Sequence, residues 1–97
     1  MDKTDHLLSF VTDKTGNMVS IHVDLPGVEI LIGELELLRQ QLRDNDCPHT
    51  HLFSPVSGGS ELTTTKLMNH PGEDNVACHV KIYGWNDEWA NRHGLKQ

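Results

Sequence analysis

Residues 76–85, VACHVKIYGW, constrain the fold most strongly, because apolar and polar side chains alternate along this run. Such alternation predicts a strand, whose successive side chains point to opposite faces of a sheet. The residues on the mainly apolar face are Val76, Cys78, Val80 and Ile82. The residues on the opposite face are Ala77, His79, Lys81 and Tyr83. The apolar face requires a second layer to cover it, and the other face is left for solvent or a partner.

A predicted helix over residues 26–43 can supply this second layer. Its apolar residues recur at helical spacing, which is typical of a side that packs against a core. The predicted core stripe consists of Leu31, Leu35, Leu38 and Leu42, with Val28 and Ile32 beside it. Pro26 suits the first helical turn, where its missing N–H needs no partner, and Asp24 can cap the free amides there.

Two alternating segments before the helix predict a β-hairpin. Residues 7–12 and 18–24 are the two strands, and residues 13–17 form the turn between them. Gly16 suits this turn because it adopts positive φ without steric cost. The residues of the second strand that we expect to point inward are Val19, Ile21 and Val23.

The remaining segments complete a β-β-α-β-(β)-β order. Residues 49–54 are a further predicted strand, and residues 62–68 a further extended segment. This order predicts an α+β fold, in which one amphipathic helix packs on one face of a small antiparallel sheet. The 97 residues suffice for one domain, which we place at residues 1–85. A polar tail at residues 86–97 follows, with one short helical turn after Asp87.

The composition limits the classes of function. The formal net charge of −6 argues against nucleic acid and anionic membranes as partners, because both attract basic surfaces. The apolar stretch at residues 28–38 is interrupted by glutamates and cannot span a bilayer. The first residues are charged and polar, unlike a targeting signal. We therefore expect a cytoplasmic protein whose Cys47 and Cys78 remain thiols.

Three histidines form the best candidate for a chemical site. His49 and His51 are two residues apart in a predicted strand and share a face, so both imidazoles could reach one metal ion. His79 could supply a third ligand if its strand pairs alongside. The alternative is that these are hydrogen-bonded structural or surface histidines. No catalytic residue is predicted, because the acidic residues before Cys47 disfavour its thiolate. No cofactor is predicted either.

Several stretches together resemble the small immunity proteins of bacterial polymorphic-toxin systems, and most closely the immunity protein 32 family. The resemblance extends over roughly residues 5–85. It lies in the hairpin, in the helix that begins near Pro-Gly-Val-Glu, and in three motifs. These motifs are HTHL at residues 49–52, GGSEL at residues 58–62 and HVKIYGW at residues 79–85. The chain departs from the family pattern at Ser57, where a tryptophan is expected before the paired glycines.

The resemblance implies a non-enzymatic protein that binds and neutralises a cognate toxin in the cytoplasm. Toxins opposed by such proteins are often nucleases, and an acidic inhibitor complements a basic active site. The protein is then a monomer or a small homo-oligomer. Its predicted contact residues are His49, His51, Glu61, His79, Tyr83 and Trp85. Two alternatives stay open: Tyr83 and Trp85 could cover a second small core, and the chain could be a structural subunit of an assembly.

Overall fold

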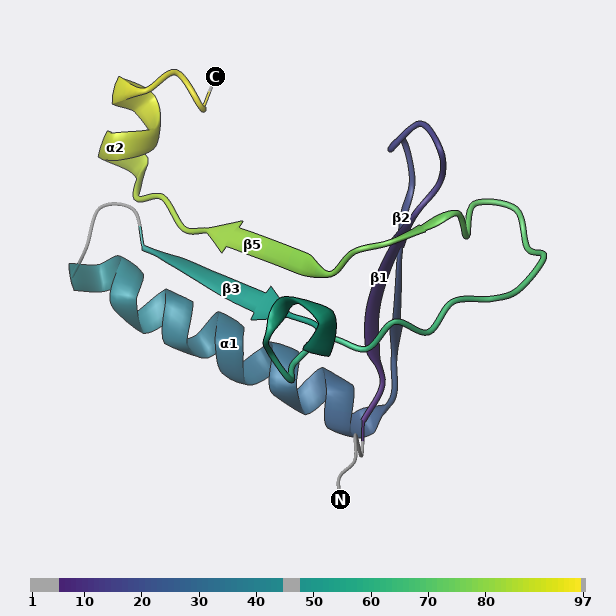
Figure 1. Cartoon of the computed structure of the whole chain (residues 1–97). Coiled ribbons are helices and arrows are strands. Elements are labelled where there is room, and N and C mark those ends of the chain that lie inside the picture. Colours follow the sequence, from purple (N-terminus) through teal and green to yellow (C-terminus); the bar gives the residue numbers. More distant parts are fainter. Residues whose placement is uncertain (1–5, 45–47, 97) are drawn as a thin grey trace.

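The computed structural model describes residues 6–44 and 48–96, and Cys47 lies outside them (Figure 1). The strands are β1 (Leu8–Thr12), β2 (Val19–Val23), β3 (His49–Phe53), β4 (Asn75–Val76) and β5 (His79–Tyr83). The helices are α1 (Leu25–Asp44), α2 (Asp87–Arg92) and the 3-10 helix η1 (Pro55–Ser57). The predicted α+β fold, with antiparallel strands and one main helix, is confirmed. Within these residues, no helix is both long and apolar enough to cross a membrane.

The strands belong to two antiparallel sheets rather than one. The first sheet has the order β2-β1-β4, and the second consists of β3 and β5. The predicted strand at residues 76–85 therefore divides. Ala77 N donates a hydrogen bond to Phe10 O of the first sheet, whereas Cys78 O accepts one from Ser54 N at the end of β3. Neighbouring residues are thus held by different sheets, and the strand breaks between them.

The core lies where the two sheets and α1 meet. Its central cluster consists of the fully buried Leu8, Leu52 and Leu62. The partly buried residues packed against them are Phe10, Ile30, Leu31, Val80 and Ile82. In Figure 1, α1 runs along β3, with the β1–β2 hairpin at one end of the helix and α2 near the other.

The helix presents a slightly different face to the core than its leucine spacing predicts. Leu38 is buried as expected, but Leu35 is exposed. Thr50 Oγ1 donates a 2.6 Å hydrogen bond to Glu34 Oε1, and this contact directs the Glu34 side of α1 toward β3. Ile30, which is not part of the predicted stripe, packs against the core instead.

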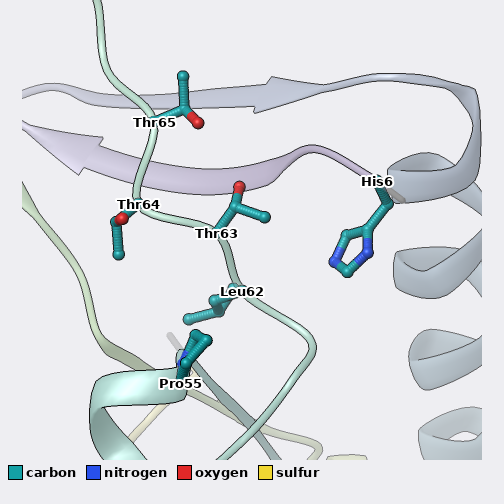
Figure 2. A pocket seen from close by; sticks show the side chains of 6 residues that line it. All are labelled: His6, Pro55, Leu62, Thr63, Thr64 and Thr65. Carbon is teal, nitrogen blue, oxygen red and sulfur yellow. The ribbon is translucent and has the colours of Figure 1, made fainter. Parts of the chain in front are cut away.

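The prediction that Val19, Ile21 and Val23 point inward is wrong, because all three are exposed. They share a face with Leu8 and Phe10 of β1, which reach the core, but the core does not extend over β2. The other face of the hairpin, which carries Ser9 and Val11, is covered as well. In Figure 2, the segment at residues 62–65 crosses the two strands of this hairpin. Thr63 N donates to Leu8 O at 2.8 Å, and Thr65 N donates to the buried Ser9 Oγ at 3.0 Å. One of these hydrogen bonds goes to a backbone carbonyl and the other to a side chain. They hold the segment in place without forming the regular backbone ladder of a strand.

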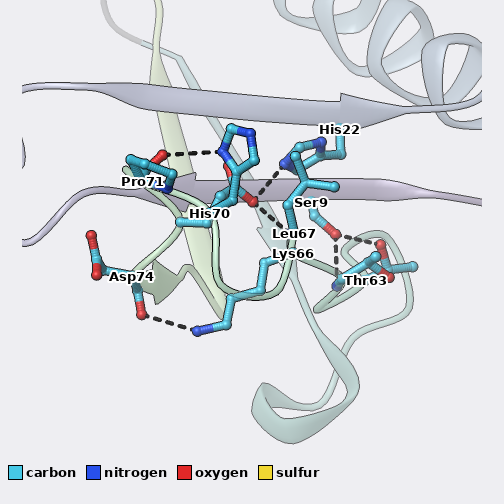
Figure 3. A network of polar contacts seen from close by, with 10 residues as sticks. Ser9, His22, Thr63, Lys66, Leu67, His70, Pro71 and Asp74 are labelled. Atoms are coloured by element: carbon cyan, nitrogen blue, oxygen red, sulfur yellow. Dashed lines mark hydrogen bonds and ion pairs between the residues drawn. The ribbon is translucent and has the colours of Figure 1, made fainter.

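A polar network closes this covered face (Figure 3). Glu73 is buried, although its position next to Gly72 predicts a solvated turn residue. Its Oε1 accepts hydrogen bonds from Leu67 N at 2.8 Å and from His22 Nε2 at 2.9 Å. The Leu67 amide and then the His22 side chain hold the pKa of Glu73 below its ordinary value, because both stabilise the carboxylate.

Glu73→Gln is expected to weaken the acid sensitivity of the fold. A carboxyl whose pKa is lower in the folded state stabilises the protein above its unfolded pKa, and this contribution is lost as the pH falls through the folded pKa. Urea unfolding between about pH 5 and pH 3 should show a steeper loss of stability for the wild type than for Glu73→Gln. Glu29→Gln, at an exposed position on α1, is the control and should follow the wild type. If the stability of wild type and of Glu73→Gln fell equally with pH, the lowered pKa of Glu73 in the folded state would be contradicted.

Candidate functional site

The exposed face of the β3–β5 sheet carries side chains with rings and one cation. The two strands pair so that His49 lies opposite Tyr83, His51 opposite Lys81 and Phe53 opposite His79. Residues directly opposite in an antiparallel pair point to the same face. The alternating side chains, among them Leu52 and Val80, point to the core. The faces predicted for residues 79–83 are thus the observed ones.

The rings of this face pack against one another. His51 and Phe53 stack at 5.5 Å between centroids with planes 5° apart, and Phe53 and His79 stack at 4.4 Å. His51 Nδ1 and His79 Nε2 also form a 2.7 Å hydrogen bond. His49 meets His51 edge-on at 5.0 Å and Tyr83 at 5.6 Å. Such contacts restrain each ring and reduce the entropy that a binding partner would otherwise have to remove.

The row of rings continues beyond the sheet onto α2. The ring centroid of Trp85 is 6.3 Å from that of Tyr83 and 6.5 Å from that of Trp89. The Trp89 ring stacks on the His93 ring with 4.5 Å between centroids. The helix is fixed at its start by Asn86, whose side chain accepts a 2.8 Å hydrogen bond from Trp89 N. We call the following set the aromatic array: His49, His51, Phe53, His79, Tyr83, Trp85, Trp89 and His93.

Two cations lie over the aromatic array. Lys81 Nζ is 4.7 Å from the centroid of the Tyr83 ring, and the Arg92 guanidinium is 5.1 Å from that of Trp89. The array is also open, since Tyr83 remains 51% exposed. Arg92 is also paired with Glu88 at 3.4 Å, so Lys81 is the cation that the β3–β5 face itself contributes.

Partial burial is the main cause that lowers the pKa of His51 below its ordinary value. Positive charge on His49, His79 and Lys81 acts in the same direction, because each would repel a protonated His51 ring. The His51 ring is consequently favoured in its neutral form. Neutral rings stack more readily and cost less to desolvate on binding.

Five of the six predicted contact residues lie in the aromatic array, and Glu61 does not. Glu61 Oε1 accepts a 3.0 Å hydrogen bond from Phe53 N, and Glu61 O accepts a 2.7 Å bond from His6 Nε2. It therefore holds the segment after η1 against β3. His22, which alternates with Ile21 and Val23 along β2, lies on the other sheet beside Glu73.

Three members of the array escape prediction from the sequence, although each carries a signal. Phe53 continues the two-residue spacing of His49 and His51 along β3. Trp89 and His93 are four residues apart, which places them on one side of a helix. What the sequence does not indicate is that α2 packs so that this side extends the sheet surface.

The three histidines of the metal hypothesis are neighbours in the structure. Within residues 6–44 and 48–96, no group of three or more His, Cys, Asp or Glu side chains is placed to hold a metal ion. His51 and His79 instead direct ring nitrogens at each other. The observed contacts are those of hydrogen-bonded, stacked histidines.

A hollow of about 350 Å³ lies apart from the array, on the side of the segment at residues 62–65 (Figure 2). Threonine side chains, His6, Pro55 and Leu62 line it. The His6 ring is bonded to Glu61 O, and Thr63 Oγ1 accepts from Leu8 N. Two of its polar groups are thus engaged in holding the fold, which leaves hydroxyl groups and no lining carboxylate or ammonium for chemistry.

A comparison with known proteins finds no matching protein-family model, no matching curated protein and no matching solved structure.

Proposed function

We propose that this protein is a non-enzymatic immunity protein that binds and neutralises a cognate bacterial toxin in the cytoplasm. The observation that carries the proposal is the aromatic array, an exposed and internally stacked row of rings on β3, β5 and α2. The resemblance of residues 49–52 and 79–85 to immunity protein 32 motifs supports the same function, because both motifs lie in this surface.

The array has the physical character of a protein-recognition surface. Tyrosine, tryptophan and arginine are the residue types most enriched at binding hot spots, and the array region holds all three. Most of its rings are carried by the paired strands β3 and β5, and all are restrained by neighbouring rings, so little entropy is lost when a partner covers them. The central imidazoles, His51 and His79, are engaged with each other, and ordered ring area of this kind favours binding over catalysis.

The partner of this surface is a protein toxin, and a basic nuclease suits the charge of the chain. The net charge of −6 would accelerate the encounter with a basic partner. Lys81 lies over the rings, and Arg92, which also does, is paired with Glu88 at 3.4 Å, so ring faces supply most of the contact. The acidic groups then act from outside the array, where they steer without being desolvated.

Growth rescue tests the proposal. The protein is expressed beside the toxin-like product of the neighbouring gene, and survivors are counted. Wild type should protect, and Tyr83→Ala/Trp85→Ala should not. Each lost hot-spot ring is expected to cost about 2 kcal/mol or roughly 30-fold in affinity, measured by calorimetry with the same toxin.

The matched control is Val56→Ala/Met68→Ala, which removes two exposed apolar side chains outside the array. This variant should protect as wild type does, and circular dichroism should show that both double variants are folded. Full protection by a folded Tyr83→Ala/Trp85→Ala variant would refute the array as the contact surface. Failure of the wild type to protect would contradict the immunity function against that toxin.

A further inference from the structure

The outer edge of β2 has backbone groups that point away from the rest of the first sheet. β2 is at the edge of the order β2-β1-β4. Asp13 N donates to Met18 O, and Asp24 N donates to Leu7 O, so these bonds flank the strand at both ends. Bonding residues alternate along an antiparallel strand, which assigns the backbone groups of three residues to the open edge. These residues are Val19, Ile21 and Val23.

The side chains of the same three residues are apolar and uncovered. Val19 is 57% exposed, Ile21 48% and Val23 38%. Edge strands are usually protected from pairing by lysine, proline, a bulge or a charged residue that points inward. The sequence of β2, VSIHV, contains no lysine, proline or carboxylate, although the whole chain carries a net charge of −6.

We infer that the β2 edge pairs with β2 of a second copy of this chain, in antiparallel register about a twofold axis at Ile21. The sequence VSIHV is nearly symmetric about its isoleucine. The twofold register therefore places Ile21 opposite Ile21 and Val19 opposite Val23, and polar Ser20 opposite His22. Each apolar pair can exchange both backbone hydrogen bonds, and its side chains are in cross-strand contact.

The charges next to β2 permit this self-pairing. In the twofold register Asp24 lies opposite Met18, and Asn17 lies opposite Leu25, so no carboxylate faces another carboxylate along the paired segment. For a chain of net charge −6, a neutral edge lowers the repulsion that two copies would otherwise feel on contact. The contact joins the two first sheets into one sheet of six strands, since each copy contributes β2, β1 and β4.

This dimer contact is independent of the proposed function. It uses the first sheet, whereas the aromatic array lies on the second sheet and α2. Self-association and toxin neutralisation can therefore succeed or fail separately in experiment.

Sedimentation velocity over a wide range of protein concentrations tests the inference. Wild type should shift from monomer to dimer as the concentration rises. Ile21→Lys places two ammonium groups at the twofold axis and should weaken dimerisation at least about tenfold, because like charges directly opposite destabilise a strand pair. Val56→Lys adds the same charge at a position that is 84% exposed and remote from β2, and it should dimerise as wild type does.

Hydrogen exchange of the unmodified protein supplies a measurement that needs no variant. The amides of Val19, Ile21 and Val23 should exchange more slowly at dimer-forming concentrations than on dilution. A wild type that stays monomeric at all concentrations would overturn the inference. So would a dimer unaffected by Ile21→Lys, or one in which these three amides gain no protection.

Discussion

Leu52→Ala is expected to lower the free energy of unfolding by about 2–5 kcal/mol, the largest stability loss among the changes considered. Leu52 is 0% exposed and belongs to the central cluster with Leu8 and Leu62. These three residues come from β3, from β1 and from the segment that covers β1, so the cavity would open where the two sheets meet. A domain of this size is stabilised by only about 5–15 kcal/mol, so the loss is a large fraction of the total.

Urea unfolding followed by circular dichroism measures this effect. The matched control is Leu37→Ala on α1, where the leucine is 49% exposed, and its cost should stay below about 1 kcal/mol. Leu52→Ala/Leu62→Ala should cost a different amount from the sum of the two single changes, because contacting residues share one cavity. Equal effects of Leu52→Ala and Leu37→Ala would show that the central cluster does not hold the sheets together.

The features of this fold that are predictable from sequence depend on local pattern. The alternation in residues 79–83 assigns His79 and Tyr83 to the solvent side and Val80 to the core, and the structure places them there. The cap of α1 is likewise local, since Asp24 Oδ1 accepts a hydrogen bond from Gly27 N three residues later. In each case, residues a few positions apart contain the whole signal.

The features that could not be predicted depend on what covers a face. Alternation along β2 separates Ile21 from His22 but does not say which side is buried. That choice is made by a threonine-rich segment without hydrophobic period, which bonds to Ser9 and brings Leu67 N to Glu73. Ser9 and Glu73 are buried polar residues, and burial of such residues follows from their hydrogen-bond partners rather than from their hydropathy.

The aromatic array also combines features that local sequence pattern predicts with features that depend on tertiary packing. The rings on β3 and β5 follow from strand alternation, so His49, His51 and His79 could be assigned to one face in advance. Trp89 reaches the same surface only because α2 turns back beside Trp85, and the short polar segment after β5 carries no pattern that fixes this angle. The extent of the aromatic array, in contrast to its centre, is a tertiary property.

Gly27→Ala is expected to destabilise the protein by about 1–3 kcal/mol, against the usual effect of this substitution in a helix. A Cβ on Gly27 would lie 1.9 Å from Leu7 O and 2.9 Å from the Leu7 carbonyl carbon. These are backbone atoms, which cannot rotate away as a flexible side chain can. Asp24 Oδ1 also accepts from both Leu7 N and Gly27 N, so displacing Leu7 would weaken the cap of α1 and the end of the hairpin together.

Gly33→Ala is the matched control for this prediction. Gly33 lies in the same helix, and a Cβ there would meet nothing within 4 Å. Alanine should therefore stabilise the protein by roughly 0.5–1 kcal/mol through helix propensity alone. Thermal and urea unfolding of the two variants should give changes of opposite sign. Stabilisation by both substitutions would mean that the contact between α1 and Leu7 can relax, and that the start of the helix is not fixed against β1 as tightly as its distances imply.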